Sequence, residues 1–120
     1  MLCDVTRWRV HASNSKKHLE VWREIMQHQR ANRQRFPYKR SRFFTMVDSE
    51  SSEEHWMYID EYEDREAFDR LYKAAEDQPD LLYSDDPRKA AQLREENRSL
   101  SVPGSSKKEL WTEHPELAVE

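Results

Sequence analysis

The side chains best suited to chemistry are two arginines and a histidine that alternate along one segment, and a distant aspartate. Arg7, Arg9 and His11 lie two residues apart in VTRWRVHA (5–12), so in a strand they share one face. An arginine can hold a carboxylate or an enolate, and a histidine exchanges a proton near neutral pH. We predict His11 as base, Arg9 as the group that stabilises the anion and Asp60 as the group that orients Arg9. The alternative is a structural ion pair between Arg9 and Asp60, with His11 at a solvated strand end.

Large aromatic side chains alternate in HWMYIDEY (55–62), the segment that holds Asp60. In a strand, Trp56, Tyr58 and Tyr62 share a face with that aspartate. Three aromatic rings on an uncovered face make a patch that usually marks an interface or a ligand site. Two interpretations stay open. These rings line a cavity for a flat ligand, together with Arg7, or they pack in a dimer interface.

The strongest argument for a nucleic-acid partner is RANRQRFPYKRSR (30–42), which holds six basic residues around Phe36 and Tyr38. Sheets with an open aromatic face also bind RNA. However, the glycine-interleaved aromatic residues of that class are absent, and the formal net charge of -4 gives no general attraction to nucleic acid. We interpret the run as a solvated helix end and expect no nucleic-acid partner.

The histidines lack the spacing of a metal site. His18 and His28 lie ten residues apart on one predicted helix, His55 lies at a turn, and His114 precedes a proline. None has the i, i+4 or short-loop spacing of transition-metal ligands. Gly104 is the only glycine, which excludes the glycine-rich loops that bind dinucleotides or phosphates. We therefore expect no metal and no cofactor.

The chain of 120 residues, with 36% hydrophobic and 37% charged residues, has the size of one domain over 1–120. A single cysteine, Cys3, leaves no internal disulfide. The beginning of the sequence, MLCDVTRW, lacks the apolar run of a signal peptide. No segment approaches the roughly 20 apolar residues of a membrane helix. We expect a cytoplasmic protein without a membrane partner.

Hydrophobic periodicity predicts strands at 5–12, 41–48, 55–63 and 107–114, and helices at 16–35, 64–76 and 87–98. Asp64 and the pair Asp86-Pro87 are helix-start signals. The order predicts an α+β, ferredoxin-like βαββαβ fold with an antiparallel sheet and helices on one face. An extra helix, in an insertion over 78–100, precedes the last strand and tail at 107–120.

Alternation within the strands then assigns residues to the two faces of the sheet. We expect the helices to cover the face with the aliphatic residues and their neighbours: Trp8, Val10, Met57 and Ile59. The uncovered face would carry every candidate site residue: Arg7, Arg9, His11, Trp56, Tyr58, Asp60 and Tyr62.

The segment YIDEYEDREAF (58–68) resembles the third strand and following helix of the dimeric α/β-barrel superfamily, and within it of antibiotic biosynthesis monooxygenase-like domains. The resemblance extends over roughly residues 4–76, and Asp60 and Tyr62 fall where that family places its acidic and aromatic pair. It implies two sheets packed face to face in a homodimer that encloses a cavity. Haem-degrading members carry a histidine on the following helix; EAFDRLYKAAE (66–76) has none, so haem chemistry is not expected. The 78–100 insertion is longer than the family's usual connection.

The resemblance implies a small-molecule-binding homodimer that acts as a cofactor-independent monooxygenase on a phenol or a quinone-like substrate. The alternative is a non-catalytic dimeric protein that binds a metabolite or a protein partner. A cavity of roughly 300 Å3 or more between the sheets would favour the enzyme. We also expect Tyr58→Glu to break the dimer, and Trp111 to be buried against the core or the partner subunit.

Overall fold

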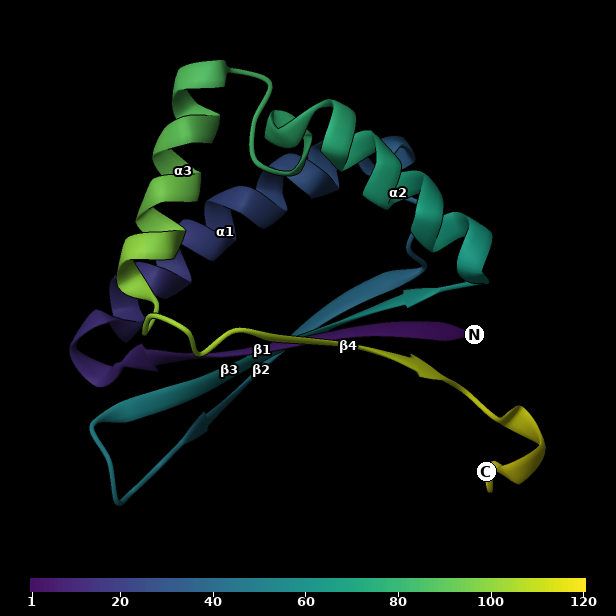
Figure 1. Ribbon diagram of the computed structural model, residues 1–120, viewed down its shortest axis with the longest axis horizontal. Coiled ribbons are helices and arrows are strands. Elements are labelled where there is room, and N and C mark those ends of the chain that lie inside the picture. The colour runs from purple at the N-terminus through teal and green to yellow at the C-terminus, as the bar shows by residue number, and fades with distance from the viewer.

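The computed structural model describes residues 1–120 and contains one sheet and three α-helices (Figure 1). The strands are β1 (Leu2–His11), β2 (Arg40–Val47), β3 (Glu53–Tyr62) and β4 (Lys107–Thr112). The helices are α1 (Ser15–Ala31), α2 (Arg65–Asp77) and α3 (Pro87–Leu100), with a short 3-10 helix, η3 (Pro79–Leu82), after α2. No helix is both long and apolar enough to span a membrane.

The four strands pair in the order β2-β3-β1-β4, and every pairing is antiparallel. The helices lie on one side of this sheet, and the other side is open (Figure 1). The predicted ferredoxin-like α+β fold is therefore confirmed.

The helix-start signals act as expected. The Asp64 side chain accepts a hydrogen bond from the backbone N–H of Ala67 at 2.9 Å, and Asp86 accepts one from Arg88 at 3.0 Å. Each bond satisfies an N–H group that has no partner within its own helix. At the other end of α1 the structure differs from the prediction, because the helix ends at Ala31 and residues 33–35 form a separate 3-10 turn.

The face assignment was wrong for β3. In the antiparallel pairing Trp8 lies opposite Trp56, and Asp4 lies opposite Asp60. Residues directly opposite each other share a face, so the aromatic face of β3 must join Trp8 beneath the helices. The aromatic rings of β3 bury more area than Met57 and Ile59 on its other face, and the helices therefore cover the aromatic face.

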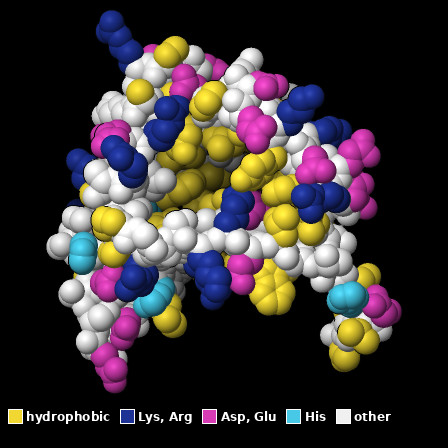
Figure 2. Space-filling model, in the orientation of Figure 1, with side chains coloured by type: hydrophobic (Ala, Val, Ile, Leu, Met, Phe, Trp, Pro, Cys, Tyr) yellow, Lys and Arg dark blue, Asp and Glu magenta, His cyan; other side chains and the backbone are white.

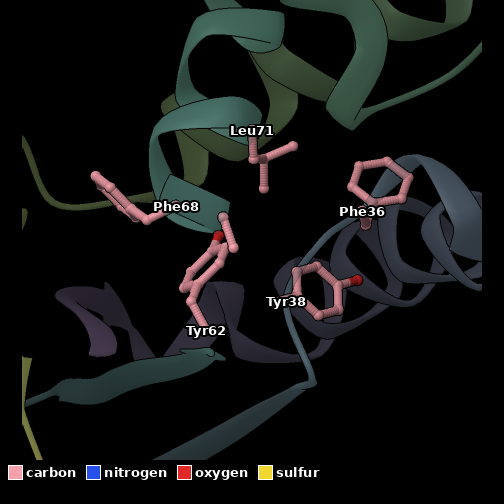
Figure 3. Close-up of a cluster of buried hydrophobic side chains, with 6 residues drawn as sticks. Phe36, Tyr38, Tyr62, Phe68 and Leu71 are labelled. Atoms are coloured by element: carbon pink, nitrogen blue, oxygen red, sulfur yellow. The ribbon is translucent and has the colours of Figure 1, made fainter. Parts of the chain in front are cut away.

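The core forms three clusters. One lies between α2, the segment before β2 and the end of β3: Phe36, Tyr38, Tyr62, Ala67, Phe68 and Leu71. Figure 3 shows the ring of Tyr62 pointing from β3 towards Phe68 and Leu71 on α2, and the Tyr62 and Phe68 rings meet edge to face at 5.4 Å. The second cluster holds Trp8, Val10 and Trp56, and the third joins α1 to α3 through Val21, Ile25 and Leu93.

The last strand brings the C-terminal segment to the sheet edge, and the tail after it extends away from the body (Figure 1). Trp111 lies opposite Cys3 in β1, on the open face, and it is 57% exposed. The expected burial of Trp111 against the protomer's own core was therefore wrong, because its side of β4 has no helix over it. Burial against a partner subunit stays a prediction.

Candidate functional site

A cavity of about 330 Å3 lies between the helices and the sheet within one chain. Figure 2 shows it as a hollow with hydrophobic side chains at its base. Eight of its 19 lining residues are aromatic: Trp22, Tyr38, Phe43, Tyr58, Tyr62, Phe68, Tyr72 and Tyr83. The sequence predicted a cavity between the sheets of two subunits, whereas this one lies on the other face of the sheet.

Polar side chains gather where β1, β3 and β4 meet the cavity. The Lys108 ammonium lies 3.1 Å from an Asp4 carboxylate oxygen and donates to the Tyr58 hydroxyl at 3.2 Å. Asp4 is only 3% exposed, and its other oxygen accepts from the Thr6 hydroxyl at 3.4 Å. Burial opposes the charge on Lys108, but Tyr58 and Asp4 together raise the Lys108 pKa above its usual range. Lys108 is the only lysine or arginine that lines the cavity.

Asp60 is the carboxyl group most altered by this environment. One of its oxygens, Oδ1, is buried and has no hydrogen-bond partner. Burial raises the pKa of Asp60 to about 7, with a further increase from the Asp4 carboxylate, while the Ser41 hydroxyl and Lys108 act in the opposite direction. A carboxyl with a pKa near neutrality can both take and return a proton at physiological pH, which suits it to general acid–base chemistry.

The phenols around Asp60 stay neutral near physiological pH. Burial raises the pKa of Tyr58 and Tyr62 above the usual tyrosine range, and raises the pKa of Tyr38 to about 12. The indole N–H of Trp22 is buried without a partner at the cavity wall. The cavity therefore offers a ligand apolar rings, one unpaired carboxyl oxygen and one unpaired N–H donor.

The seven predicted site residues do not form one site. Tyr58, Asp60 and Tyr62 line the cavity, but Trp56 does not. Trp56 is 3% exposed and packs against His18, with ring centroids 4.4 Å apart.

The three basic candidates project from the opposite face of β1. Arg9 pairs with Glu53 at 3.1 Å instead of with Asp60, so the predicted Arg9–Asp60 contact was wrong. Arg7 pairs with Glu109 on β4, and His11 is exposed at the end of β1. The strand alternation that grouped these three residues was correct, and only their assignment to the face of Asp60 failed.

A second hollow, the open-face groove, has a volume of about 480 Å3 and lies over the ends of β1, β2 and β3. Its side chains are mixed in character and include Arg7, Arg9, Met46, His55, Met57 and Lys107. Arg7 and Arg9 are each already bound to a glutamate. Three of the predicted residues, Arg7, Arg9 and Trp56, line the groove, and the buried indole N–H of Trp56 has no hydrogen-bond partner.

Two residues of the site were missed in the sequence. Asp4 precedes the predicted start of the first strand, and Lys108 is the second residue of the last one. Asp4 continues the alternation of Thr6 and Trp8, so a strand extended to Leu2 would have placed it on their face. No local signal places Lys108 beside Tyr58, because that contact depends on the long-range pairing of β1 with β4.

The chain shares its fold with solved monooxygenases, among them an antibiotic biosynthesis monooxygenase, and this is the fold that the resemblance at residues 58–68 implied. No protein-family model matches the chain, and no curated protein sequence matches it either.

Three solved structures illustrate the likeness. An antibiotic biosynthesis monooxygenase has 17% sequence identity and a TM-score of 0.59, with 96% of this chain and 100% of that chain covered. A mutant of SnoaB, a cofactor-independent oxygenase from Streptomyces nogalater, has 16% identity and a TM-score of 0.55 over 93% of this chain and 91% of that one. The monooxygenase from the gene ActVA-Orf6 of Streptomyces coelicolor, in complex with the ligand nanaomycin D, has 19% identity and a TM-score of 0.56 over 94% and 87%. At these identities the likeness shows the fold alone.

Proposed function

We propose that the chain binds a small aromatic hydroxy compound in the cavity and oxygenates it without a metal or an organic cofactor. The observation that carries this proposal is the unpaired Asp60 oxygen at an aromatic cavity, beside Tyr58 and Lys108. The fold shared with oxygenases supports it.

The shape and lining of the cavity favour a small, flat ligand. Its volume of about 330 Å3 is near the lower end of the range for ligand pockets, about 300–1,000 Å3. Aromatic walls bind flat rings by stacked and edge-to-face contacts. A hydroxyl group on the ligand would satisfy the unpaired Asp60 oxygen, and a carbonyl or second oxygen would satisfy the indole N–H of Trp22.

In the proposed reaction Asp60 removes the hydroxyl proton of a phenol or hydroquinone, and the Lys108 ammonium stabilises the resulting anion. The anion gives one electron to dioxygen, and the substrate radical and superoxide then join through a new carbon–oxygen bond. The ring carbon loses its proton as the oxygen–oxygen bond breaks, so a carbonyl group and one water molecule result. Asp60 takes the role predicted for His11, because His11 lies on the other face of the sheet.

Dioxygen uptake with a panel of hydroquinones, including that of naphthalene, tests the proposal. We expect uptake above the rate in buffer, and its loss in Asp60→Asn. Asp77→Asn, an exposed carboxylate in the last turn of α2, is the matched control and should behave as the wild type. Equal uptake by the wild type and Asp60→Asn would disprove the role of Asp60. Ligand binding without uptake would favour the non-catalytic binding protein instead.

We also propose a homodimer through the open sheet face. That face presents exposed apolar side chains, with Phe44 at 42%, Met46 at 60% and Trp111 at 57%, and such a patch usually marks an interface. Tyr58→Glu no longer tests it, since Tyr58 lies beneath the helices. Phe44→Glu should give a monomer in analytical ultracentrifugation, because it would bury a charge without a partner. A monomeric wild type at micromolar concentration would contradict the proposal.

A further inference from the structure

We propose that residues 79–83 form a cap that limits the size of ligand in the cavity, and that Gln29 is the positioning residue that holds this cap. The inference rests on the proposed ligand site, but not on the proposed oxygenation. The cap consists of η3 and Tyr83, at the start of the insertion between α2 and α3. Leu82 and Tyr83 on the cap, and Gln29 on α1, all line the cavity.

The Gln29 side chain joins the cap to the opposite part of the cavity wall. Its amide nitrogen donates to the backbone carbonyl of Leu82 at 3.1 Å. Its amide oxygen accepts from the Tyr38 hydroxyl at 2.8 Å. Gln29 is only 8% exposed and Tyr38 only 6%, so both bonds are shielded from water and costly to leave unmade. One buried amide therefore fixes the distance between the cap and the Tyr38 side of the wall.

The neighbouring residue on α1 holds the preceding carbonyl of the cap. The His28 Nε2 atom lies 2.8 Å from the Leu81 carbonyl oxygen, which can only accept, so this nitrogen donates. On the outer side, Arg94 of α3 pairs with Asp80, and its guanidinium lies 5.4 Å from the centroid of the Tyr83 ring. These contacts attach the cap to α1 on one side and to α3 on the other.

The cap depends on these few side-chain contacts because it has little support of its own. It has a single 3-10 helix of four residues with no buried residue. Its apolar side chains Leu81, Leu82 and Tyr83 are only partly buried where they pack against the core. Segments with few buried apolar contacts open at low free-energy cost. A change that releases the Leu82 carbonyl from Gln29 should therefore let the cap move outward and admit larger ligands.

The test compares two hydroxylated arenes of different size, naphthol and hydroxypyrene, in binding titrations followed by tryptophan fluorescence, since Trp22 lines the cavity. Gln29→Met removes both hydrogen bonds at similar volume. Gln27→Met, the same change at an exposed position of α1, is the matched control. A second variant, Leu82→Ala, shortens a cap side chain without touching Gln29.

We expect the preference for naphthol over hydroxypyrene, as the ratio of their dissociation constants, to fall by about tenfold in Gln29→Met, because the buried hydrogen bond that holds the Leu82 carbonyl of the cap is among the two that are lost. Leu82→Ala should lower it in the same direction, and Gln27→Met should leave it unchanged. Hydrogen exchange at residues 79–83 should accelerate in Gln29→Met. If naphthol binds but neither Gln29→Met nor Leu82→Ala changes the preference, the cap is disproved while the ligand site stands. If neither arene binds the wild type, the ligand site itself fails, and the cap with it.

Discussion

The helix-facing side of the sheet has two halves, and each buries an ionisable side chain in a different way. In the half around Trp8 and Trp56, His18 is fully buried, accepts a hydrogen bond from the Trp8 indole at 3.1 Å and packs among rings. In the other half, Asp60 lies at a cavity. Each residue has one buried atom without a hydrogen-bond partner, Nδ1 in His18 and Oδ1 in Asp60, but only the Asp60 atom belongs to a residue that lines the cavity. We call these the solid half and the hollow half.

Burial alters the pKa in both halves, so an altered pKa alone does not mark a site. It lowers the pKa of His18 to about 4 and raises that of Asp60 to about 7. His18 lines neither the cavity nor the open-face groove, whereas Asp60 lines the cavity. The difference shows that the empty volume beside the group, more than the size of the shift, separates a structural ionisable residue from a candidate catalytic one.

The largest expected effect is on turnover in the hollow half. Asp60→Asn should lower kcat/KM for hydroquinone oxygenation by about 100-fold or more, because a positioned base contributes roughly 10²–10⁴-fold. In the wild type kcat/KM should rise with pH and level off above about 7, since only the ionised Asp60 accepts a proton. His18→Gln should keep this profile. A profile unchanged in Asp60→Asn would remove the distinction between the halves.

A change in side-chain volume should affect stability in the solid half and ligand binding in the hollow half. Trp56→Ala in the solid half should lower the free energy of unfolding by about 3–5 kcal/mol, as loss of a large buried ring does. Ala75→Met, at the cavity wall, should change stability by less than about 1 kcal/mol, because it fills existing space. It should nevertheless abolish naphthol binding. Denaturant unfolding measures the stability of the two variants, and binding titrations measure their affinity for naphthol. If Ala75→Met lost as much stability as Trp56→Ala, the hollow half would be as tightly packed as the solid half.

The two ionisable residues should also give opposite pH dependence of stability. His18 has a lowered folded pKa, so its contribution to stability is present above about 6.5 and is lost as pH falls towards 4. Asp60 has a raised folded pKa, so its contribution is present below about 4 and is lost as pH rises towards 7.

Relative to the wild type, Asp60→Asn should therefore gain stability as pH rises from 4 to 7, by an amount on the order of 2 kcal/mol. His18→Gln should gain stability relative to the wild type as pH falls through the range from 6.5 to 4. Urea unfolding across this pH range gives both differences. Differences that stay constant with pH would contradict the assigned shifts.

The smallest expected effect concerns the cation beside Asp60. Lys108 lowers the Asp60 pKa, though less than the Ser41 hydrogen bond does, so Lys108→Met should move the midpoint of the pH–rate profile slightly upward. Lys107→Met, on the open face one residue earlier, should leave the midpoint unchanged. A midpoint that did not move in Lys108→Met would mean that Lys108 does not influence the pKa of Asp60.

The element order could be predicted from the sequence, because hydrophobic periodicity and helix-start residues such as Asp64 and Asp86 are local signals. The face of β3 could not, since both of its sides are apolar: Trp56 and Tyr58 alternate with Met57 and Ile59. Only the register with Trp8 decides between them. The site was half predicted for the same reason. Asp60 lies within a recognisable strand, whereas Asp4 and Lys108 become its neighbours through pairings that no local pattern contains.

The position of Lys108 on an edge strand has a consequence for protein engineering. Residues 107–112 form the outermost strand on one side of the sheet, and none of their side chains belongs to the three core clusters. The segment that carries the cavity's only cation can therefore be substituted without removing a side chain from the core clusters. A library restricted to these six positions would vary the charge presented to a ligand while the rest of the scaffold is inherited intact.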